Sequence, residues 1–408
     1  MTLGQENNCK QMKLTMNNNM RISSQKWMKT RGICFLLIPL LFSCTPSKES
    51  ACYVVNIDPD SPQRTEQVFD SLFQYENHII LEETEMSKIK QIDKTVIKDG
   101  QIYLLDNHSK ILVFDMDGKF LRHKNLMGHG RGECLNISDF DIKGDCLYVL
   151  DKGGSKINVY DLELHFKESI EVNAAHGIFV TDDGFALDHE FGFADGKSDK
   201  DYSYSYFKNG NYSYQIPFHP GLRGRSYGFS SGGNYFYEYD DDSVFCFFPF
   251  NDMVYRLEKD GSLHNYMQIK VGERVVRPDA SDQELDDALH SNIPTNIFAF
   301  YKFKDLFLFS FYDKNDKRVD VFYRLRNGFL SYGQTGLDSN GIPVSITSYT
   351  QKDGGEYKLL NIVTPEILTY FYRKHQNDDG FPVLNGIGEQ IQGNGNPVLI
   401  FYRLRETL

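Results

Sequence analysis

Short apolar runs alternate with polar turns along most of the chain, and part of this pattern is repeated. Residues 102–106 (IYLLD) and 110–115 (KILVFD) form one pair of strand-like runs. Residues 147–151 (LYVLD) and 156–161 (KINVYD) form a second pair, 45 to 46 residues further on. A repeat of about 40–50 residues with several strands in each copy is typical of a β-propeller blade.

An aromatic residue ends a similar strand-like run at six places, which are Phe114, Tyr160, Tyr206, Tyr255, Tyr323 and Tyr402. The intervals between them are 46, 46, 49, 68 and 79 residues. The first long interval contains residues 281–290 (SDQELDDALH), where a Ser cap and helix formers predict a short helix. The second contains residues 365–373, for which we also predict some helix. The series predicts an all-β, six-bladed β-propeller with four-stranded antiparallel blades.

A ring of blades must be closed, because one four-stranded blade alone cannot bury both of its faces. The chain ends in a strand-like run at residues 398–405, and early runs occur at 53–57 and 79–83. We therefore predict that the N- and C-terminal strands share the last blade.

The N-terminal region has the pattern of an export signal. Basic residues 29 and 31 precede an apolar run at 33–42, which is too short to span a bilayer, and the run ends in Leu-Phe-Ser-Cys44. This ending resembles the bacterial lipobox, which predicts lipidation of Cys44; the alternative is an ordinary signal peptide with an incidental Cys. We predict an N-terminal extension and signal peptide (1–43), a lipidated tether (44–55) and a propeller (56–408). The protein would then be exported and lipid-anchored in the outer membrane, on its periplasmic or surface face.

Composition limits the classes of partner. The formal net charge is −12, and an acidic surface is repelled by a nucleic-acid backbone, so we expect no nucleic-acid partner. The seven cysteines have neither the number nor the spacing of a disulfide framework or zinc site. We expect cysteines 52, 134, 146 and 246 to be small buried apolar residues, with a Cys134–Cys146 disulfide as an alternative.

Four segments carry a family resemblance. Residues 103–106 with 114–118, followed by the turn at 128–133 (GHGRGE) and the closing run 396–399 (NPVL), resemble six-bladed β-propeller lipoproteins of Gram-negative gut-type bacteria. That family is related in fold to NHL propellers, and its turn usually reads Gly-x-Gly-Pro-Gly-Glu; here Arg131 replaces the Pro. The resemblance covers roughly residues 55–408 and implies the fold, but it supplies no catalytic residues.

Two Gly/Arg turns supply the candidate ligand-binding residues. A phosphate-binding loop needs a helix behind it, whereas β pattern follows the turn at 128–133, so this turn is better explained as an interblade connection. His129 and Arg131 would nevertheless lie on an exposed turn within reach of a ligand. The turn at 221–227 (GLRGRSY) offers Arg225 and Tyr227 in the same way.

Evidence for a cofactor is weak. Acidic clusters at 240–242 and 313–320 could hold Ca²⁺, but neither has EF-hand spacing, and solvated turn charges explain them more simply. No HExxH or GxSxG motif occurs. We therefore predict no catalytic residue, no metal ligand and no cofactor.

Two functions remain open. The first is a surface lipoprotein that uses one propeller face to bind a glycan, a peptide or a membrane protein partner. The second is a hydrolase or lyase with a metal-assisted site at the mouth of the central channel, which a channel lined by His and carboxylates would favour. Because the sequence contains no catalytic motif, it favours binding, although the fold itself hosts both functions.

Overall fold

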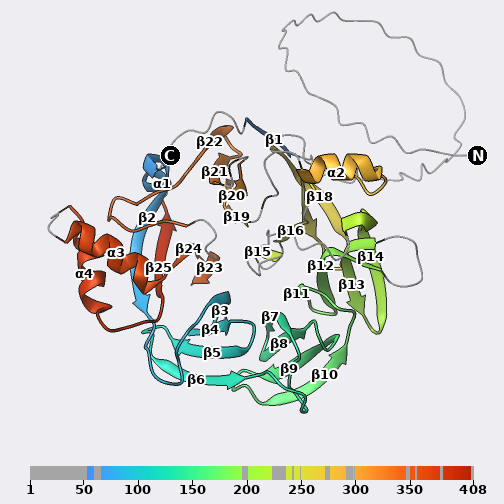
Figure 1. Cartoon of the computed structure of the whole chain (residues 1–408), viewed down its shortest axis with the longest axis horizontal. Helices are drawn as coiled ribbons and strands as arrows, with labels where there is room; N and C mark the ends of the chain where they lie inside the picture. Colours follow the sequence, from blue (N-terminus) through green and yellow to red (C-terminus); the bar gives the residue numbers. More distant parts are fainter. Residues whose placement is uncertain are drawn as a thin grey trace, which may run out of the picture. The chain divides into compact units, whose positions relative to one another are not determined.

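The computed structural model describes residues 53–58, 66–194, 201–222, 236–240, 243–248, 250–271, 276–290, 297, 299–313, 315, 317–345, 350–353, 356–376 and 380–405. These residues belong to one compact unit, Ser50–Leu408. Six sheets surround a common centre in this unit, and each contains four antiparallel strands (Figure 1). These strands are consecutive along the chain in five sheets, whereas the sixth combines one strand from the N-terminal part with three from the C-terminal end. The predicted six-bladed β-propeller is confirmed.

The first three blades follow the chain without interruption, with the first strand of each blade nearest the centre (Figure 1). Blade 1 contains β3 (Ile92–Lys98), β4 (Gln101–Asp106), β5 (Lys110–Asp115) and β6 (Phe120–Asn125). Blade 2 contains β7 (Ile137–Lys143), β8 (Cys146–Asp151), β9 (Lys156–Asp161) and β10 (Phe166–Glu171). Blade 3 contains β11 (Gly177–Val180), β12 (Phe185–Ala194), β13 (Asp201–Lys208) and β14 (Asn211–Phe218).

The last three blades carry additions. Blade 4 contains β15 (Phe236–Asp240), β16 (Ser243–Phe247), β17 (Met253–Leu257) and β18 (Leu263–Val271), with β1 (Tyr53–Ile57) outside them. Blade 5 contains β19 (Ala299–Phe303), β20 (Leu306–Tyr312), β21 (Arg318–Arg324) and β22 (Phe329–Gly333). Blade 6 contains β23 (Thr350–Asp353), β24 (Glu356–Val363), β25 (Val398–Leu404) and, outermost, β2 (Phe73–Ile80).

The helices lie between strands. They are α1 (Glu66–Leu72), the 3₁₀ turn η1 (Pro220–Leu222), α2 (Asp282–His290), α3 (Pro365–His375) and α4 (Pro382–Gln390). The predicted helix at 281–290 is α2, and Ser281 caps it through a reciprocal pair of hydrogen bonds with Glu284. The predicted helical piece at 365–373 is α3, whereas α1 and α4 were not expected.

All six residues of the aromatic series lie in the third strand of a blade, from Phe114 in β5 to Tyr402 in β25. Apart from Tyr323, which is partly exposed, they are buried. Most apolar clusters join adjacent blades; one, for example, packs Phe114 of blade 1 against Leu399 and Phe401 of blade 6. The core is therefore a set of layers between blades, which explains why each repeat contributes a bulky ring at the same place.

The two ends of the propeller chain meet in blade 6. Strand β2 pairs antiparallel with β25, with Ile80 opposite Val398, so the predicted sharing of the last blade is confirmed. Strand β1 pairs in parallel with β18 and gives blade 4 a fifth strand. In β1 Val55 and Ile57 are buried, which explains why this stretch, partly placed in the expected tether, forms a strand.

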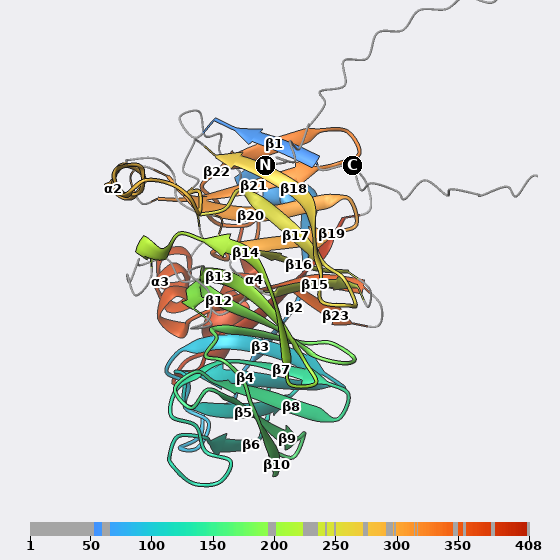
Figure 2. The same ribbon diagram turned by 90° about the vertical axis from the view of Figure 1, so that its right-hand side faces the viewer.

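The helices α2, α3 and α4 share one end of the propeller. Strand direction alternates, so the connections from each outer strand to the next inner strand leave from one end, as do the loops between second and third strands. Helix α2 lies in such a connection, and α3 and α4 lie between the second and third strands of blade 6. We call this end the connection face (left in Figure 2) and the other end the hairpin face.

Candidate functional site

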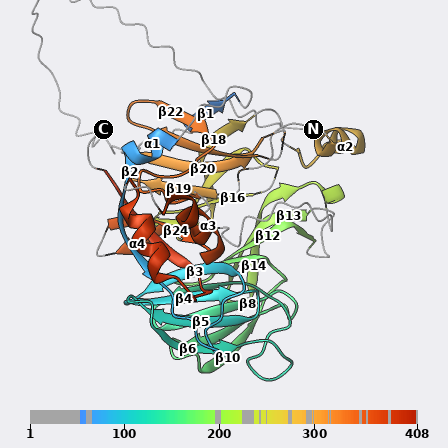
Figure 3. The same cartoon turned by 60° about the vertical axis from the view of Figure 1, so that its left-hand side comes forward.

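An open groove of about 700 Å³ lies on the connection face of blade 6, within the size range of small-molecule sites. Its lining residues are Pro365, Glu366, Thr369, Tyr370, Arg373, Lys374, Asn394 and Gly395. One wall is a single face of α3, and the other is the loop that leads into β25. Figure 3 shows α3 and α4 side by side at blade 6.

Helix α3 forms because an apolar face can be buried and a Pro opens its first turn. Leu368 is fully buried. A Cβ on Gly388 of α4 would lie 2.3 Å from the ring of Tyr372, so α4 approaches α3 closely only because a glycine is there. The opposite face of α3 is left free to line the groove.

The groove offers an aromatic ring among polar side chains. Tyr370 is 60% exposed, and its ring meets Phe371 edge-on at a centroid distance of 5.1 Å. Glu366 lies one helical turn before Tyr370 on the same wall, and Thr369 directly precedes it. A flat apolar surface beside hydrogen-bonding groups is suited to a ligand with an apolar face and a polar edge.

The far end of this wall is positively charged. Arg373 and Lys374 are exposed in the last turn of α3, where cations also stabilise the helix dipole. Within the described residues, neither side chain makes an ion pair or a hydrogen bond. Glu366 lies in the first turn, so the wall runs from negative to positive along the groove.

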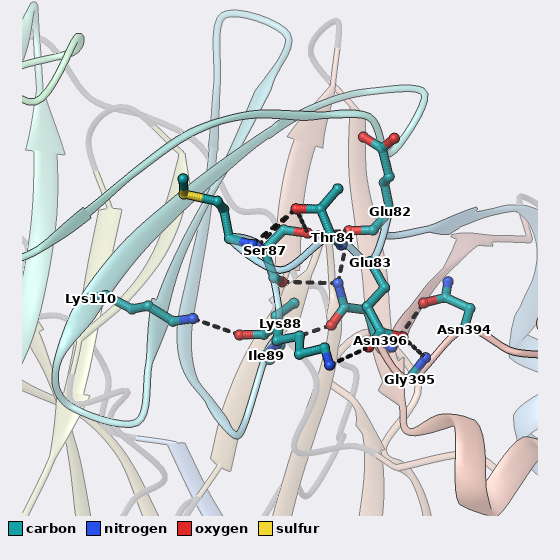
Figure 4. Close-up of polar contacts among 11 residues, drawn as sticks. Glu82, Glu83, Thr84, Ser87, Lys88, Ile89, Lys110, Asn394, Gly395 and Asn396 are labelled. Carbon is teal, nitrogen blue, oxygen red and sulfur yellow. Dashed lines mark hydrogen bonds and ion pairs between the residues drawn. The ribbon is translucent and has the colours of Figure 1, made fainter.

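The second wall belongs to the place where the ring closes, which we call the closing seam (residues 82–89 and 394–396; Figure 4). Asn396 is buried there; its side-chain amide donates to the carbonyls of Glu82 and Ser87 and accepts from the N–H of Ile89. All three distances are 2.8–3.0 Å. The seam therefore holds the loop that forms the groove wall in one position.

The groove-lining residues of the seam are themselves fixed. The Asn394 side chain donates to the carbonyl of Leu81, and the Gly395 N–H donates to the carboxylate of Glu83. Glu83 also lies 3.7 Å from the ammonium of Lys88. This wall is rigid before any ligand arrives, which lowers the entropic cost of binding.

Near the centre, three charged side chains join the inner strands of blades 1, 2 and 3. We call this cluster the inner clasp (Lys94, Asp139 and Asp141). The Lys94 ammonium of β3 lies 2.8 Å from Asp139 of β7. Asp139 and Asp141 accept hydrogen bonds from the N–H groups of Ile178 and Val180 in β11. Two carboxylates thus satisfy the open edge of the next inner strand.

Burial raises the pKa of both carboxyl groups of the inner clasp. Burial raises the pKa of Asp139 to about 6, although Lys94 beside it lowers that pKa. Burial likewise raises the pKa of Asp141. The ion pair of Asp139 with Lys94 and the hydrogen bonds from Ile178 and Val180 each join two neighbouring blades, so the clasp has a structural role.

The described residues give little support to an enzyme. Ser205 lies 2.8 Å from Nε2 of His189, whose Nδ1 contacts the Ala174 carbonyl, a pairing that resembles a nucleophile and its base. Ser205 is fully buried, however, and burial lowers the pKa of His189 to about 4, so the imidazole is neutral and packed in the core.

The acidic clusters considered for Ca²⁺ have internal partners where they are described. Asp313 accepts from the N–H groups of Asn315 and Lys317, and Asp320 accepts from Ser310 and Arg318. Across the residues the structure describes, no three His, Cys, Asp or Glu side chains are grouped to hold a metal. The cluster at 240–242 lies largely outside the described residues.

His129 and Arg131 lie on the connection from β6 to β7 and are exposed, but neither lines the groove. Arg131 stacks over the ring of Phe166 at 5.5 Å, and the Glu133 carboxylate accepts the Gly130 N–H. Their role in ligand binding remains a prediction. Arg225, Tyr227 and Cys44 lie outside the described residues.

The alternative of a Cys134–Cys146 disulfide is wrong, because both cysteines are free. Cys134 is buried, where its sulfur accepts a hydrogen bond from Asn158. Cys146 is partly exposed beside the ammonium of Lys167.

The fold and groove define a six-bladed propeller with a helical insertion in its last blade. Residues 52–403 match the family model described as Domain of unknown function (DUF4934). The match covers most of the chain, so this protein belongs to that family. No curated protein matches the sequence.

Solved structures support the fold. A Bacteroides fragilis protein named as an exported protein aligns with a TM-score of 0.62 at 13% identity, covering 87% of this chain and all of the other. A DUF4221 family member from Bacteroides vulgatus aligns at 0.47 and 10% identity, covering 82% and 97%. Virginiamycin B lyase from Staphylococcus aureus aligns at 0.36 and 10% identity, covering 65% and 75%. The last two scores are too low to support an argument about chemistry.

Proposed function

We propose that this chain is an exported, lipid-anchored propeller that binds an oligosaccharide in the groove between α3 and the closing seam. The exposed ring of Tyr370 among hydrogen-bonding side chains carries the proposal. Sugar rings present a C–H face that stacks on an aromatic ring and a rim of hydroxyls that hydrogen-bond to polar side chains.

A saccharide fits the groove better than an extended peptide does. The walls are a helix face and a loop, so no open strand edge is present for a peptide to extend as an added strand. The groove combines a larger apolar area with scattered polar and charged groups, a mixture that suits the C–H face and the hydroxyl rim of a sugar ring.

Binding is tested by titrating the purified chain with a panel of oligosaccharides by calorimetry. We expect Tyr370→Ala to lower affinity at least tenfold while leaving the melting temperature unchanged. Phe329→Ala is the matched control, because Phe329 is a similarly exposed ring that begins β22 at the hairpin face. Saccharide binding that survives Tyr370→Ala, or no saccharide binding at all, would contradict the proposal.

Export and anchoring rest on the lipobox-like ending at Cys44 and on the exported structural relative. Among the described helices, none has the length and apolar character needed to cross a membrane. In a Gram-negative host, we expect the wild-type chain to incorporate a labelled fatty acid and to fractionate with membranes. Cys44→Ser should lose both properties; a label that persists in this variant would contradict lipidation at Cys44.

A further inference from the structure

We infer that the ligand of this groove is an acidic oligosaccharide, one that carries a carboxylate or sulfate group near the C-terminal end of α3. The inference rests on the proposed function and adds the chemical class of the ligand. Its basis is the juxtaposition of Arg373 and Lys374 with Tyr370 along one wall.

Two neighbouring cations of α3, Arg373 and Lys374, have no anionic partner among the described residues. The formal net charge is −12, and acidic side chains outnumber basic ones by 56 to 44. On the seam side, Lys88 and Lys110 have partners in the Glu83 carboxylate and the Lys88 carbonyl. Arg373 and Lys374 border the groove, where an anionic group of a ligand would pair with them.

The helix dipole explains part of this arrangement. Cations in a last turn stabilise a helix whether or not a ligand binds, so charge alone does not define a site. The lining of the groove is the second observation, because both cations border the same space as the exposed ring of Tyr370. A guanidinium binds a carboxylate or sulfate through two parallel hydrogen bonds, which gives a geometric preference as well as attraction.

The opposite end of the groove sets the ligand's direction. Glu366 lies two turns before Arg373 on the same wall and would repel an acidic group placed there. A ligand with an acidic sugar at one end and a neutral sugar at the other therefore fits in one orientation, with a ring stacked on Tyr370 between them.

The experiment compares three probes on the full chain by calorimetry: an oligogalacturonate, a sulfated galactan oligosaccharide and a neutral galactan oligosaccharide of the same length. We expect at least one acidic probe to bind tenfold or more tightly than the neutral one, with an affinity that falls as salt rises. The two acidic probes distinguish a carboxylate from a sulfate.

The double variant Arg373→Gln, Lys374→Gln should reduce acidic binding at least tenfold and leave neutral binding within about twofold. The matched control is Lys90→Gln, Lys317→Gln, which removes two exposed cations from the same face outside the groove. Equal losses in both double variants would mean general attraction to charge and would overturn the inference.

The remaining outcomes separate the inference from the proposed function. Equal binding of neutral and acidic probes, both lost in Tyr370→Ala, would overturn the acidic class but keep the groove as a saccharide site. Binding of an acidic peptide with no saccharide bound would overturn both.

Discussion

Two equivalent connections in this propeller are held in place differently. Residues 81–91 lead into blade 1, and residues 126–136 lead into blade 2, 45 positions later. In both, the last residue of the second strand, Asp106 or Asp151, accepts hydrogen bonds from two successive N–H groups near the end of the connection. The shared part of the joint is therefore encoded in the repeat itself.

A lysine makes the second contact that the two connections have in common. Lys110 donates to the carbonyl of Lys88, and Lys156 donates to the carbonyl of Glu133, at equivalent places. This explains why both repeats read Asp, then a short turn, then Lys before an apolar strand. The two residues hold each blade to the connection that precedes it.

The third contact differs. The connection at 126–136 is held by Asn158 of the blade that follows it, 24 to 25 positions away. The connection at 81–91 is held by Asn396, more than 300 positions away. Both connections are covalent, but at the closure the third contact also joins the connection to the loop before β25 at the far end of the chain, next to the β2–β25 pairing.

The strongest test removes the distant contact. Asn396→Ala removes three hydrogen bonds and leaves the Ser87 carbonyl and the Ile89 N–H without their partner, whereas the Glu82 carbonyl still accepts from the Ser87 hydroxyl; we expect a loss of about 4 kcal/mol in unfolding free energy. Urea unfolding measures it, with Asn77→Ala as the control, because Asn77 is exposed on β2. A loss below that of Asn158→Ala would remove the distinction between the two joints.

The inner clasp offers a charged joint for comparison. Lys94→Met leaves the buried carboxylate of Asp139 without its ion pair, and we expect a loss of about 3 kcal/mol at pH 8. The loss should shrink at pH 5, because the pKa of Asp139 is raised to about 6 and the carboxyl is then protonated. Lys98→Met, on the same strand but at its exposed end, is the control.

The free energy of unfolding of the wild-type chain should also depend on pH through Asp139, and the direction of this dependence can be stated. Asp139 keeps its proton in the folded state up to about pH 6, whereas it would lose it near its ordinary value when unfolded. This group's contribution to stability therefore falls as pH rises from about 4 to 6, and Asp139→Asn should remove that slope. The cost of Asn396→Ala should be independent of pH over this range, since the amide does not titrate.

The local contact should be weaker than the distant one. Asn158→Ala removes the amide that reaches Glu133 and Cys134, but Lys156 still donates to the Glu133 carbonyl. We expect a loss of about 2 kcal/mol in the same urea assay. A cost equal to that of Asn396→Ala would mean that both joints depend on one amide to the same degree.

The smallest effect is expected on the exposed turn of the local connection. Arg131→Ala removes a guanidinium stacked over Phe166, for an expected loss of about 0.5 kcal/mol. Saccharide affinity should not change, because Arg131 does not line the groove. A tenfold loss of affinity would instead make the turn at 128–133 part of the binding site.

The regular part of the fold could be predicted because each repeat carries the same residues for the same physical reason. The aromatic series from Phe114 to Tyr402 marks the third strands, since each ring fills a layer between blades. The insertions were also visible, as intervals of 68 and 79 residues where the period lengthens.

What the sequence did not reveal depends on tertiary contacts. Helix α4 contains Gly386 and Gly388, which are poor helix formers, and its packing against Tyr372 appears only in the folded chain. The parallel pairing of β1 with β18 joins segments about 210 positions apart. Neither has a local signal.

The groove was missed for the same reason. A polar and aromatic face on α3, with Glu366, Tyr370 and Arg373 at helical spacing, could have suggested one wall. The other wall, at Asn394 and Gly395, is positioned by contacts with residues 81–83 at the far end of the chain. The sequence pattern instead indicated the glycine-rich turns at 128–133 and 221–227, because turn residues can be recognised from a short stretch of sequence.

The fifth strand of blade 4 has a mechanical consequence. Any tension applied to the chain before residue 53 reaches β1 first, and the β1–β18 ladder must shear or peel before force arrives at α1 and β2. Force therefore reaches β2, the strand that closes the ring, only after β1 has detached from β18. Pulling from the N-terminus should release a short length of chain in a first event, while blade 6 and its groove stay assembled until a second.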